Sequence, residues 1–456
     1  MNIYIEIEIL KRELSGKILL SLELIKQKNN VYLTTREAIT KCGINNDIPP
    51  GIIFLKDLNS EEYRINDYQK LLKNGFTLIS QDEEIGCFKD KSYDKFFNDR
   101  IKGVEAKVFN YVEKFLCWGK FDHNYLKDLN LKTEFINTGS PRIDLCIDNN
   151  KYYNQNKKQI LVCLNQNIFW KRDFLERYKL TLLNNTENKP IHKVADQMFK
   201  NESKDLILTL HFYNLIRKLK ELDDYKIIIR PHPGMDDKKV EGLFADKSIF
   251  PNAKVSSKGA LIDQISESDI IIHSGCTSAV ESTLNNKVVI CISPDDTYLN
   301  DYKKDTVMTK IGFSFNTPES ILEFIKNLKS KKEEIQNKIY EDKKKIAERT
   351  EIDGNSYKRI SQVISEINLK KNYKTKNTDF AFKRFGNKIT IKRVIKNKIL
   401  KLLNINNDNQ NAFEAKFPSF DKVEIEQKIK DYNINLDINS KYKIKYLNER
   451  CIKIYN

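Results

Sequence analysis

The chain has 456 residues and a formal net charge of +16, from 79 lysines and arginines against 63 aspartates and glutamates. This length is too great for one ordinary core and predicts two domains plus an extension. Hydrophobic residues make up 40% of the chain, which excludes a disordered or fibrous protein. No apolar run approaches the about 20 residues that a membrane-spanning helix needs.

The eight cysteines are scattered, and no two of them have CxxC spacing. A secreted disulfide framework and a zinc site are therefore not expected, and a reducing cytoplasmic compartment is favoured. The first residues, MNIYIEIEIL, mix acidic with apolar side chains and do not have the pattern of a signal peptide. No nucleic-acid-binding signature accompanies the positive charge, so nucleic acid is not an expected partner.

Strands alternate with helices over the first 300 residues. Residues 3–9, 31–33, 51–55 and 77–79 are expected to be strands, with helices over 14–28 and through 68–72. A second series of strands is expected at 160–165, 226–230, 269–273 and 287–292, with a helix over 206–222. Such alternation predicts βαβ units and a mostly parallel sheet in each of two α/β domains, over residues 1–153 and 154–355.

Residues 356–456 are expected to form a basic, partly helical extension outside both domains. A charged surface helix is expected over residues 327–349 before it. Twelve lysines and arginines lie between Lys370 and Lys401, against one acid, Asp379. Apolar residues interleave with these charges over 388–403, which predicts a basic amphipathic helix. The alternatives are docking on an anionic membrane surface, a bridge between domains and a solvated surface of biased composition.

The motif Arg-Pro-His-Pro-Gly follows the expected strand 226–230. Ligands bind at strand ends in open α/β sheets, and the prolines fix the backbone around His232. His232 and Arg230 are therefore candidates to bind a phosphate. The alternative is a turn that ends the strand and packs the histidine.

A second motif, HSGCTSAVE, follows the expected strand 269–273. Its glycine permits close approach of the backbone, and its hydroxyl side chains precede a helix whose N–H groups can bind phosphate. The acidic residue that follows can reach a ribose diol. The alternative is an ordinary helix cap. The candidate nucleotide-binding residues here are His273, Ser274, Gly275, Thr277, Ser278 and Glu281.

Acidic residues near expected strand ends are candidates for the chemistry. The TGSPRID segment carries Arg142 and Asp144 at the junction of the two domains, or the two pair with each other in a plain turn. The expected catalytic carboxylates, as general base or nucleophile, are Asp144, Glu83 and Glu84. The expected acceptor-binding residues are Glu8, Asp82 and Arg142. No P-loop, dinucleotide fingerprint or HExxH motif is present.

Together these motifs resemble the bacterial surface carbohydrate biosynthesis proteins, which are glycosyltransferases of the GT-B fold. The resemblance includes the IExxxREL, PGIIxxK, DEExG, TGSPRxD, RPHP and HSGCTSAVES segments, and more weakly the KFP segment at residues 416–418. RPHP and HSGCTSAVE are also similar to motifs of CDP-glycerol transferases and of CMP-sugar transferases. Members of the family usually carry asparagine where this chain has Ser274.

The resemblance implies two Rossmann-like domains facing across a cleft, with a glycan acceptor bound by the first and an activated sugar nucleotide by the second. It places His232 and Pro233 against the nucleotide and implies that no metal or other cofactor is needed. The expected activity is transfer of a sugar, such as a CMP-linked ulosonic acid, to a surface polysaccharide or lipopolysaccharide. Alternatives are polyol-phosphate transfer from a CDP-alcohol, an NDP-sugar epimerase, and a membrane-docked scaffold that binds nucleotides without turnover.

Overall fold

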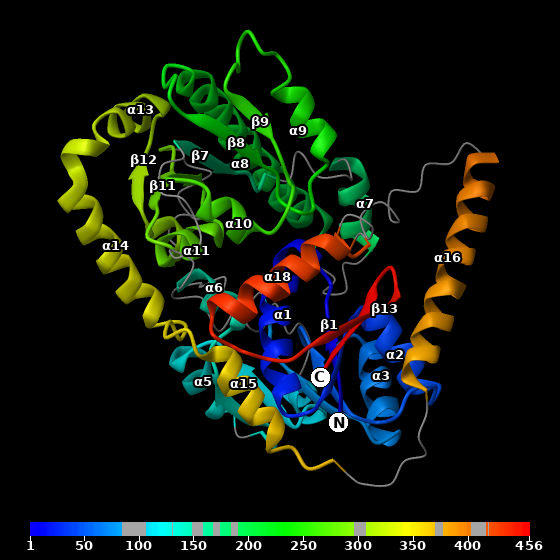
Figure 1. Ribbon diagram of the computed structural model, residues 1–456. Coiled ribbons are helices and arrows are strands. Elements are labelled where there is room, and N and C mark those ends of the chain that lie inside the picture. Colours follow the sequence, from blue (N-terminus) through cyan, green and yellow to red (C-terminus); the bar gives the residue numbers. More distant parts are fainter. Residues whose placement is uncertain are drawn as a thin grey trace. The chain divides into compact units, whose positions relative to one another are not determined.

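The computed structural model describes residues 1–83, 106–129, 131–147, 158–166, 174–183, 190–295, 307–369, 377–402, 416–417 and 419–456. The chain forms two compact units. Unit 1 comprises residues 1–86, 93–148 and 346–456, and unit 2 comprises residues 87–92 and 149–345. Each unit is built around one sheet (Figure 1).

Unit 1 contains an eight-stranded sheet in the order β13-β14-β2-β1-β3-β4-β5-β6. The six strands from β2 to β6 are parallel. Their bounds are β1 Asn2–Glu6, β2 Asn30–Thr34, β3 Ile52–Leu55, β4 Thr77–Ser80, β5 Lys114–Cys117 and β6 Glu134–Asn137. The helices between them are α1 Leu10–Lys26, α2 Arg36–Ile44, α3 Glu62–Lys73, the 3-10 helix Ala106–Tyr111, α5 Lys120–Lys127 and α6 Pro141–Ile147.

Burial explains why these segments take these positions. Strands β1, β2 and β3 are rich in isoleucine, valine and aromatic residues, and the apolar side chains of Ile5, Leu33 and Ile52 are fully buried. Helix α1 covers the sheet with Ile18 and Leu22, which are also fully buried. The first strand of the chain, β1, therefore lies inside the sheet, with β2 on one side and β3 on the other.

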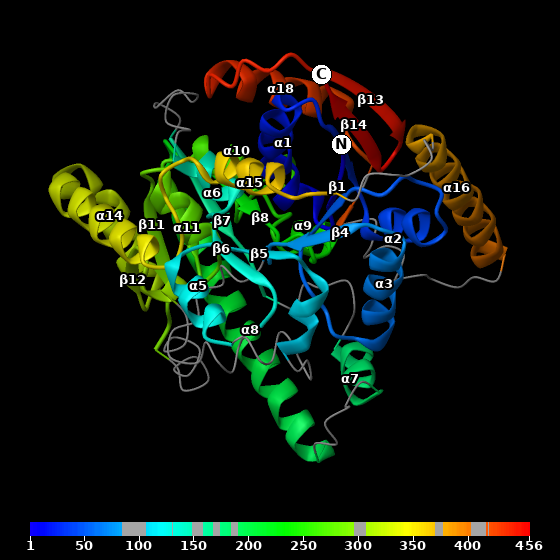
Figure 2. The same ribbon diagram turned by 90° about the horizontal axis from the view of Figure 1, so that it is seen from below.

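The last hundred residues of the chain belong to unit 1. They form α15 Ser356–Ser365, α16 Thr378–Leu402, α18 Lys422–Asn435, β13 Lys443–Asn448 and β14 Cys451–Tyr455. Strand β14 pairs antiparallel with β2, and both chain termini lie on this side of unit 1 (Figures 1 and 2). This differs from the prediction that residues 356–456 form an extension outside both domains.

The physical reason for this difference is the open edge of the parallel sheet. Without β14, strand β2 would expose unpaired backbone groups at the edge. The alternating sequence of β14 buries Ile452 and Ile454 completely in the core of unit 1. Helix α16 is attached nearby through Phe382, which is buried against the rings of Tyr4 and Tyr32.

Unit 2 contains a six-stranded, all-parallel sheet in the order β12-β11-β10-β7-β8-β9. Its strands are β7 Gln159–Cys163, β8 Lys226–Arg230, β9 Ala253–Val255, β10 Ile270–His273, β11 Val288–Ile292 and β12 Phe313–Phe315. Its helices are α7 Phe174–Leu183, α8 Ile191–Leu219, α9 Asp237–Leu243, α10 Leu261–Ser266, α11 Ser278–Leu284, α13 Pro318–Lys326 and α14 Lys332–Ala347, with 3-10 helices at Val307–Lys310 and Leu328–Lys331.

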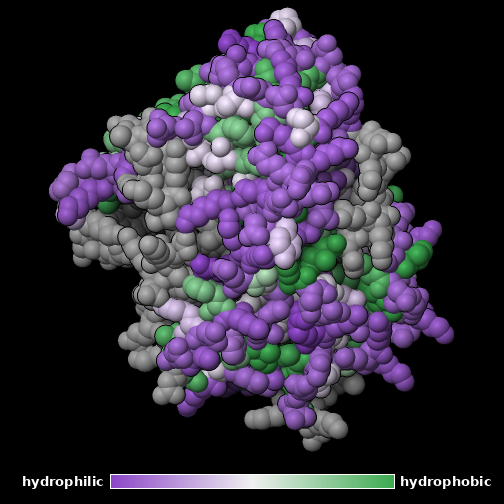
Figure 3. Space-filling model, turned by 90° about the vertical axis from the view of Figure 1, so that its left-hand side faces the viewer, coloured by the Kyte–Doolittle hydropathy of each residue, from purple (hydrophilic) through white to green (hydrophobic). Residues whose placement is uncertain are grey.

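The predicted α/β class and the two parallel sheets are confirmed. The expected strands correspond to β1 to β4, β7, β8, β10 and β11, and the expected basic helix lies within α16. Six strands were not expected from the sequence pattern: β5, β6, β9, β12, β13 and β14. Helix α14 is the expected charged surface helix, and the face on its side of the molecule is largely hydrophilic (Figure 3). Among the described residues, no helix is long and apolar enough to cross a membrane.

We predict that Ile454→Ala lowers the free energy of unfolding by about 2–4 kcal/mol, because it leaves a cavity beside β2. Ile454 is fully buried and pairs with Val31. The matched control is Ile434→Ala on α18, where the isoleucine is 62% exposed and the expected change is below about 0.5 kcal/mol. Urea unfolding of the full chain measures both. Equal changes in the free energy of unfolding in the two variants would contradict the packing of the β13–β14 hairpin into the core of unit 1.

Candidate functional site

The sheet of unit 2 has a switch point between β7 and β10. From β7 the chain adds β8 and β9 on one side of the sheet, and then β10, β11 and β12 on the other. In an open parallel sheet, ligands bind in the crevice outside the carboxyl ends of the strands at such a point. The segments at these ends are residues 164–166 after β7, 231–234 after β8 and 274–277 after β10. The two histidine motifs are therefore in the expected position.

The histidines of the two motifs make the same turn. Nδ1 of His232 accepts a hydrogen bond from the backbone N–H of Gly234 at 3.1 Å. Nδ1 of His273 accepts one from the N–H of Gly275 at 2.9 Å. Nε2 therefore carries the hydrogen in the neutral form of each ring. Gly275 has a φ angle of +91°, a left-handed conformation that side chains other than glycine rarely adopt.

The two histidines differ in their exposure. His273 is fully buried, and burial lowers its pKa to about 4, so its ring is neutral near pH 7. It fits the alternative of a packed histidine that shapes the loop after β10. His232 is half-buried at the end of β8, next to the half-buried Pro233. His232 therefore has the exposure that a ligand contact requires.

Ser274 connects the segments on the two sides of the switch point. Its Oγ donates a hydrogen bond to Oδ1 of Asn165 at 3.0 Å and accepts one from Nε2 of Gln166 at 3.4 Å. Gln166 is fully buried, and within the described residues its Oε1 has no hydrogen-bond partner. This crevice thus contains a buried acceptor, in a place where ligands bind in this class of sheet.

Arg230 makes its hydrogen bonds within the protein. Its guanidinium donates to the carbonyl oxygen of Gly259 at 3.0 Å and to that of Lys258 at 3.4 Å. Burial lowers the pKa of Arg230, and the nearby carboxylate of Glu281 partly offsets this shift. The structure therefore shows Arg230 holding the loop after β9 in place, which is a different contact from the expected one with a phosphate.

The remaining predicted residues lie at the start of α11. Thr277 is half-buried and occupies the N-cap position without a side-chain cap, while Ser278 and Glu281 are buried in the helix. Sγ of Cys276 is hydrogen-bonded to Oγ of Ser278. Of the predicted hydroxyl residues in this motif, Thr277 is thus the most accessible.

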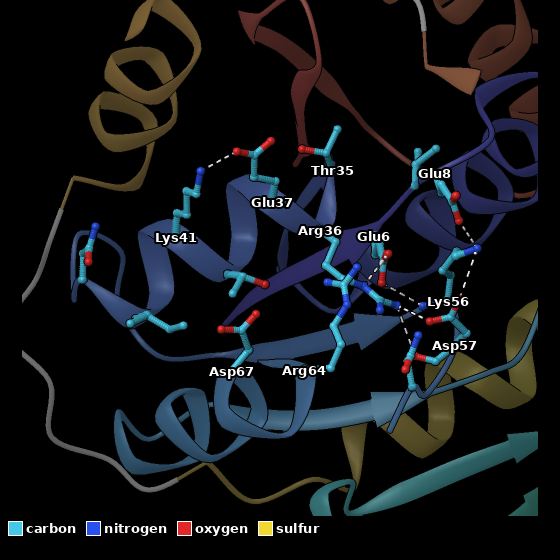
Figure 4. A pocket seen from close by; sticks show the side chains of 15 residues that line it. Glu6, Glu8, Thr35, Arg36, Glu37, Lys41, Lys56, Asp57, Arg64 and Asp67 are labelled. Atoms are coloured by element: carbon cyan, nitrogen blue, oxygen red, sulfur yellow. Dashed lines mark hydrogen bonds and ion pairs between the residues drawn. The ribbon is translucent and has the colours of Figure 1, made fainter. Parts of the chain in front are cut away.

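Unit 1 has a second switch point, between β1 and β3, and a cavity lies there. The cavity has a volume of about 610 Å³ and is lined by residues that follow β1, β2 and β3 and by residues of α2 and α3 (Figure 4). Its lining residues are Glu6, Ile7, Glu8, Thr35, Arg36, Glu37, Thr40, Lys41, Ile44, Asn45, Lys56, Asp57, Asn59, Arg64 and Asp67. Its size is typical of a small-molecule site.

A network of ion pairs forms the inner wall of this cavity. Arg36 lies between two carboxylates, with Nε 2.7 Å from Oε1 of Glu6 and Nη2 2.5 Å from Oδ1 of Asp57. Lys56 pairs with Asp57 at 3.2 Å and with Glu8. Oε2 of Glu6 also accepts a hydrogen bond from the backbone N–H of Lys56 at 3.1 Å. These contacts fix the loops after β1 and β3 to each other.

The predicted acceptor-binding residue Glu8 lines the cavity, whereas Asp82, Glu83 and Arg142 do not. Asp82 and Glu83 follow β4 and are both buried. Glu83 forms a buried ion pair of 2.6 Å with Lys17 of α1. Burial alone would raise the pKa of Glu83, but this lysine outweighs that effect and the pKa is lowered. Glu84 lies outside the described residues.

Asp144 and Arg142 both lie in α6. Oδ1 of Asp144 accepts a hydrogen bond from Oγ of Ser356 at 2.7 Å, and Oδ2 accepts one from the N–H of Tyr357 at 2.9 Å. Asp144 therefore binds the start of α15, which is a structural contact. Burial raises its pKa to about 6, although these hydrogen bonds lower it. The guanidinium of Arg142 lies over the ring of Trp118, 5.8 Å from its centroid.

Three basic residues of this site were not among the predicted functional residues: Arg36, Lys56 and Lys416. Arg36 and Lys56 follow strands β2 and β3 at the same edge as Glu8, so the strand-end rule could have identified them. Lys416 lies 408 residues from Glu8, yet its Nζ donates to Oε1 of Glu8 at 2.7 Å. Only the fold brings these two motif residues together. Among the described residues, no group of three or more His, Cys, Asp or Glu side chains could hold a metal ion.

Comparisons with known proteins give the same fold. No protein-family model matches the chain, and no curated protein matches it. A structure of the wall teichoic acid polymerase TagF is similar, with a TM-score of 0.51 and 14% identity over 80% of this chain and 88% of that chain. A variant of that polymerase gives a TM-score of 0.50 with 13% identity over 80% and 88% of the chains.

A UDP-N-acetylglucosamine 2-epimerase has a TM-score of 0.46, with 13% identity over 83% of this chain and 98% of that chain. The two parallel-sheet α/β domains of this protein are of the GT-B type, as the resemblance implied.

We predict that Asp144→Asn changes the pH dependence of stability. The ordinary pKa of this carboxyl is 3.8 and its folded pKa is about 6, so the unfolded chain releases the proton first as the pH rises. Protonated Asp144 therefore stabilises the folded protein fully below its pKa in the unfolded chain. This stabilisation is lost as the pH rises through its pKa in the folded protein. Between about pH 3.5 and 7, the wild type should lose about 3 kcal/mol relative to the variant.

Urea unfolding at several pH values measures this difference. Asp353→Asn is a control of opposite sign, because a hydrogen bond from Arg359 lowers the pKa of Asp353. As the pH rises through the acid range, the wild type should therefore gain stability relative to Asp353→Asn. A flat difference for Asp144→Asn would contradict its burial as the cause of the raised pKa.

Proposed function

We propose that the protein is a GT-B glycosyltransferase that transfers a sugar from a nucleotide-activated donor to a cell-surface glycan. Unit 2 would bind the donor at its switch point, and unit 1 would bind the acceptor in the cavity at its own switch point. The observation that carries the proposal is the turn of His232 at the end of β8. Because Nδ1 accepts from Gly234, the N–H of the neutral ring is at Nε2, and this half-buried ring has the orientation and exposure to donate to a phosphate oxygen.

The crevice of unit 2 offers further groups for such a donor. Thr277 supplies a half-buried hydroxyl group, and the buried Oε1 of Gln166 can accept a hydrogen bond from a ligand hydroxyl or amino group. Ser274 fixes Asn165 and Gln166 through its own two hydrogen bonds. Donors such as Thr277 and His232 can stabilise the negative charge that develops on a leaving phosphate. Glu83 and Asp144 have structural partners, so the proposal assigns the general base to neither of them.

A second candidate reaction is polyol-phosphate transfer from a CDP-alcohol. It is favoured by the likeness of the fold to the wall teichoic acid polymerase TagF. Both reactions release a nucleotide from an activated donor, so the same crevice serves either. Incubation with CMP-sugars or CDP-glycerol, followed by assay of released CMP, distinguishes them.

We predict that His232→Asn weakens the binding of CMP or CDP by about 10- to 100-fold, as expected for loss of one hydrogen bond to a charged group. Asparagine can still accept from the N–H of Gly234, but it has no donor at the position of Nε2. Thermal shift with CMP, CDP, UDP and GDP selects the nucleotide, and calorimetry measures its affinity.

Two further variants test the assignment. His232→Gln places an amide N–H near the position of Nε2 and should bind more tightly than His232→Asn. His192→Ala removes an exposed histidine of unit 2 and should leave binding unchanged. Unchanged binding in both His232→Asn and Ser274→Ala would refute the proposed donor site.

We further propose that the protein acts at an anionic membrane surface. Helix α16 carries eight lysines and arginines, Asp379 as its one acidic residue, and Ile391 and Ile395 that are 60% and 53% exposed. These isoleucines lie one turn apart on the same face of the helix. Basic helices with exposed apolar residues bind anionic lipid. Four further bases of the predicted stretch, in residues 370–376, lie outside the described residues.

We predict that the protein co-sediments with phosphatidylcholine vesicles that contain phosphatidylglycerol and not with phosphatidylcholine alone. Combined Lys383→Glu and Lys388→Glu should reduce this binding at least about tenfold, since each base near the surface contributes about 1 kcal/mol. Phe199→Ser on α8, where the phenylalanine is 58% exposed, is the control for an exposed apolar residue elsewhere. Binding that the charge reversal leaves intact would exclude α16 as the contact.

A further inference from the structure

The cavity of unit 1 is polar, charged and nearly neutral overall. Its lining contains the acidic residues Glu6, Glu8, Glu37, Asp57 and Asp67 and the basic residues Arg36, Lys41, Lys56 and Arg64. Most of these charges are already paired within the protein, so a ligand is not needed to neutralise them. A ligand with a net charge of either sign would meet like charges on the wall. The lining therefore disfavours a strongly charged ligand of either sign.

Within the ion-pair network of the inner wall, Glu8 is the acidic residue best placed to meet a ligand. Its side chain is 31% exposed, whereas those of Glu6 and Lys56 are 3% and 6% exposed. It is held between Lys56 from the loop after β3 and Lys416 from the carboxyl-terminal part of the chain. Burial would raise the pKa of Glu8, but the two lysines outweigh this and lower it. Glu8 is therefore an ionised acceptor whose position is fixed from two sides.

Helix α3 contributes a donor and an acceptor from the other wall. Arg64 and Asp67 lie one turn apart and extend toward the cavity (Figure 4). Nε of Arg64 is buried and has no hydrogen-bond partner among the described residues. The cavity thus has the carboxylate of Glu8 on one wall and the guanidinium group of Arg64 on the other. A hydroxyl group can donate to the first and accept from the second.

No aromatic residue lines the cavity in the part of the chain that the structure describes, so these residues provide no platform on which a nucleotide base could stack. Its neutral polar residues are Thr35, Thr40, Asn45 and Asn59, and its aliphatic ones are Ile7 and Ile44. Such a surface offers many donors and acceptors alongside aliphatic carbon atoms, a mixture that the hydroxyl groups and C–H groups of a sugar can both contact. The ligand that matches it carries many hydroxyl groups, no net charge and no planar base.

We infer that this cavity binds a neutral, polyhydroxylated ligand, a sugar or polyol unit of a glycan, with Glu8 as its central hydrogen-bond acceptor. This rests on the proposed function and names the class of acceptor for it. Lys416 is a positioning residue, because it acts through Glu8. The carboxyl-terminal part of the chain therefore completes the acceptor site from within unit 1.

The experiment uses the full-length chain on a glycan array that contains neutral hexose and N-acetylhexosamine oligosaccharides and matched uronic-acid oligosaccharides. Binding to neutral members is expected. Calorimetry with the best neutral oligosaccharide then compares variants. Glu8→Gln should weaken binding at least tenfold, because an amide is a poorer acceptor and its NH2 group faces two lysines. Binding only to acidic members would overturn the inference.

Lys416→Met and Lys416→Arg separate positioning from simple stability. The methionine keeps the aliphatic chain and loses the ion pair, so a loss of about three- to tenfold in glycan affinity is expected, with rescue by arginine. Glu424→Gln on α18 is the matched control and should have no effect on glycan affinity, because this partly exposed glutamate does not line the cavity. Equal affinities in Lys416→Met and the wild type would exclude the positioning role.

Nucleotide binding distinguishes this inference from the proposed function. Glu8 lies in unit 1, so Glu8→Gln should leave the thermal shift produced by the nucleotide unchanged. Binding of neutral glycans without binding of any nucleotide would support the cavity and overturn the transferase. Nucleotide binding with glycan affinities that Glu8→Gln leaves unchanged would support the donor site and overturn the cavity.

Discussion

The structure depends on where each sheet begins. In both units the first strand, β1 or β7, lies inside the sheet, and later strands are added on each side of it. This order separates the connections at the carboxyl ends of neighbouring strands and leaves a crevice there. Apart from Lys416, the groups named for the two proposed sites lie at or after the carboxyl end of a strand, or on a helix beside it. Strand order, more than any single residue, therefore determines where the sites are.

Buried charge imposes the second constraint, and it acts mainly in unit 1. Glu6, Arg36, Asp57 and Lys56 are largely removed from water, and each has a partner of opposite charge. Breaking such a network is costly because the partner left behind stays buried and charged. The network thus holds three loops at fixed positions around the cavity. It also explains why a charged wall can serve a neutral ligand, since its charges are balanced internally.

The sequence predicted the parts of the fold that local pattern controls. Strands such as 226–230 and 269–273 are short, β-branched and bounded by turn residues, and both were placed correctly. The hairpin β13–β14 could not be predicted in this way, because its role is to cover an edge formed some 400 residues earlier. In the same way, the motif around Asp144 predicted a carboxylate that takes part in the chemistry. In the structure this carboxylate accepts hydrogen bonds from Ser356 and Tyr357 at the start of α15. A local sequence pattern does not show which residues far along the chain a side chain will contact.

The two histidine motifs show how burial separates residues that sequence cannot distinguish. His232 and His273 follow parallel strands, precede a glycine by two positions and accept the same hydrogen bond. Full burial makes one of them part of the loop's interior, while the half-buried one keeps a donor at the surface of the crevice. The net charge is divided in a similar way. Helix α16 carries eight bases and one acid, whereas the described lining of the cavity carries four bases and five acids. The proposed membrane contact and the proposed glycan site therefore use different groups of charges.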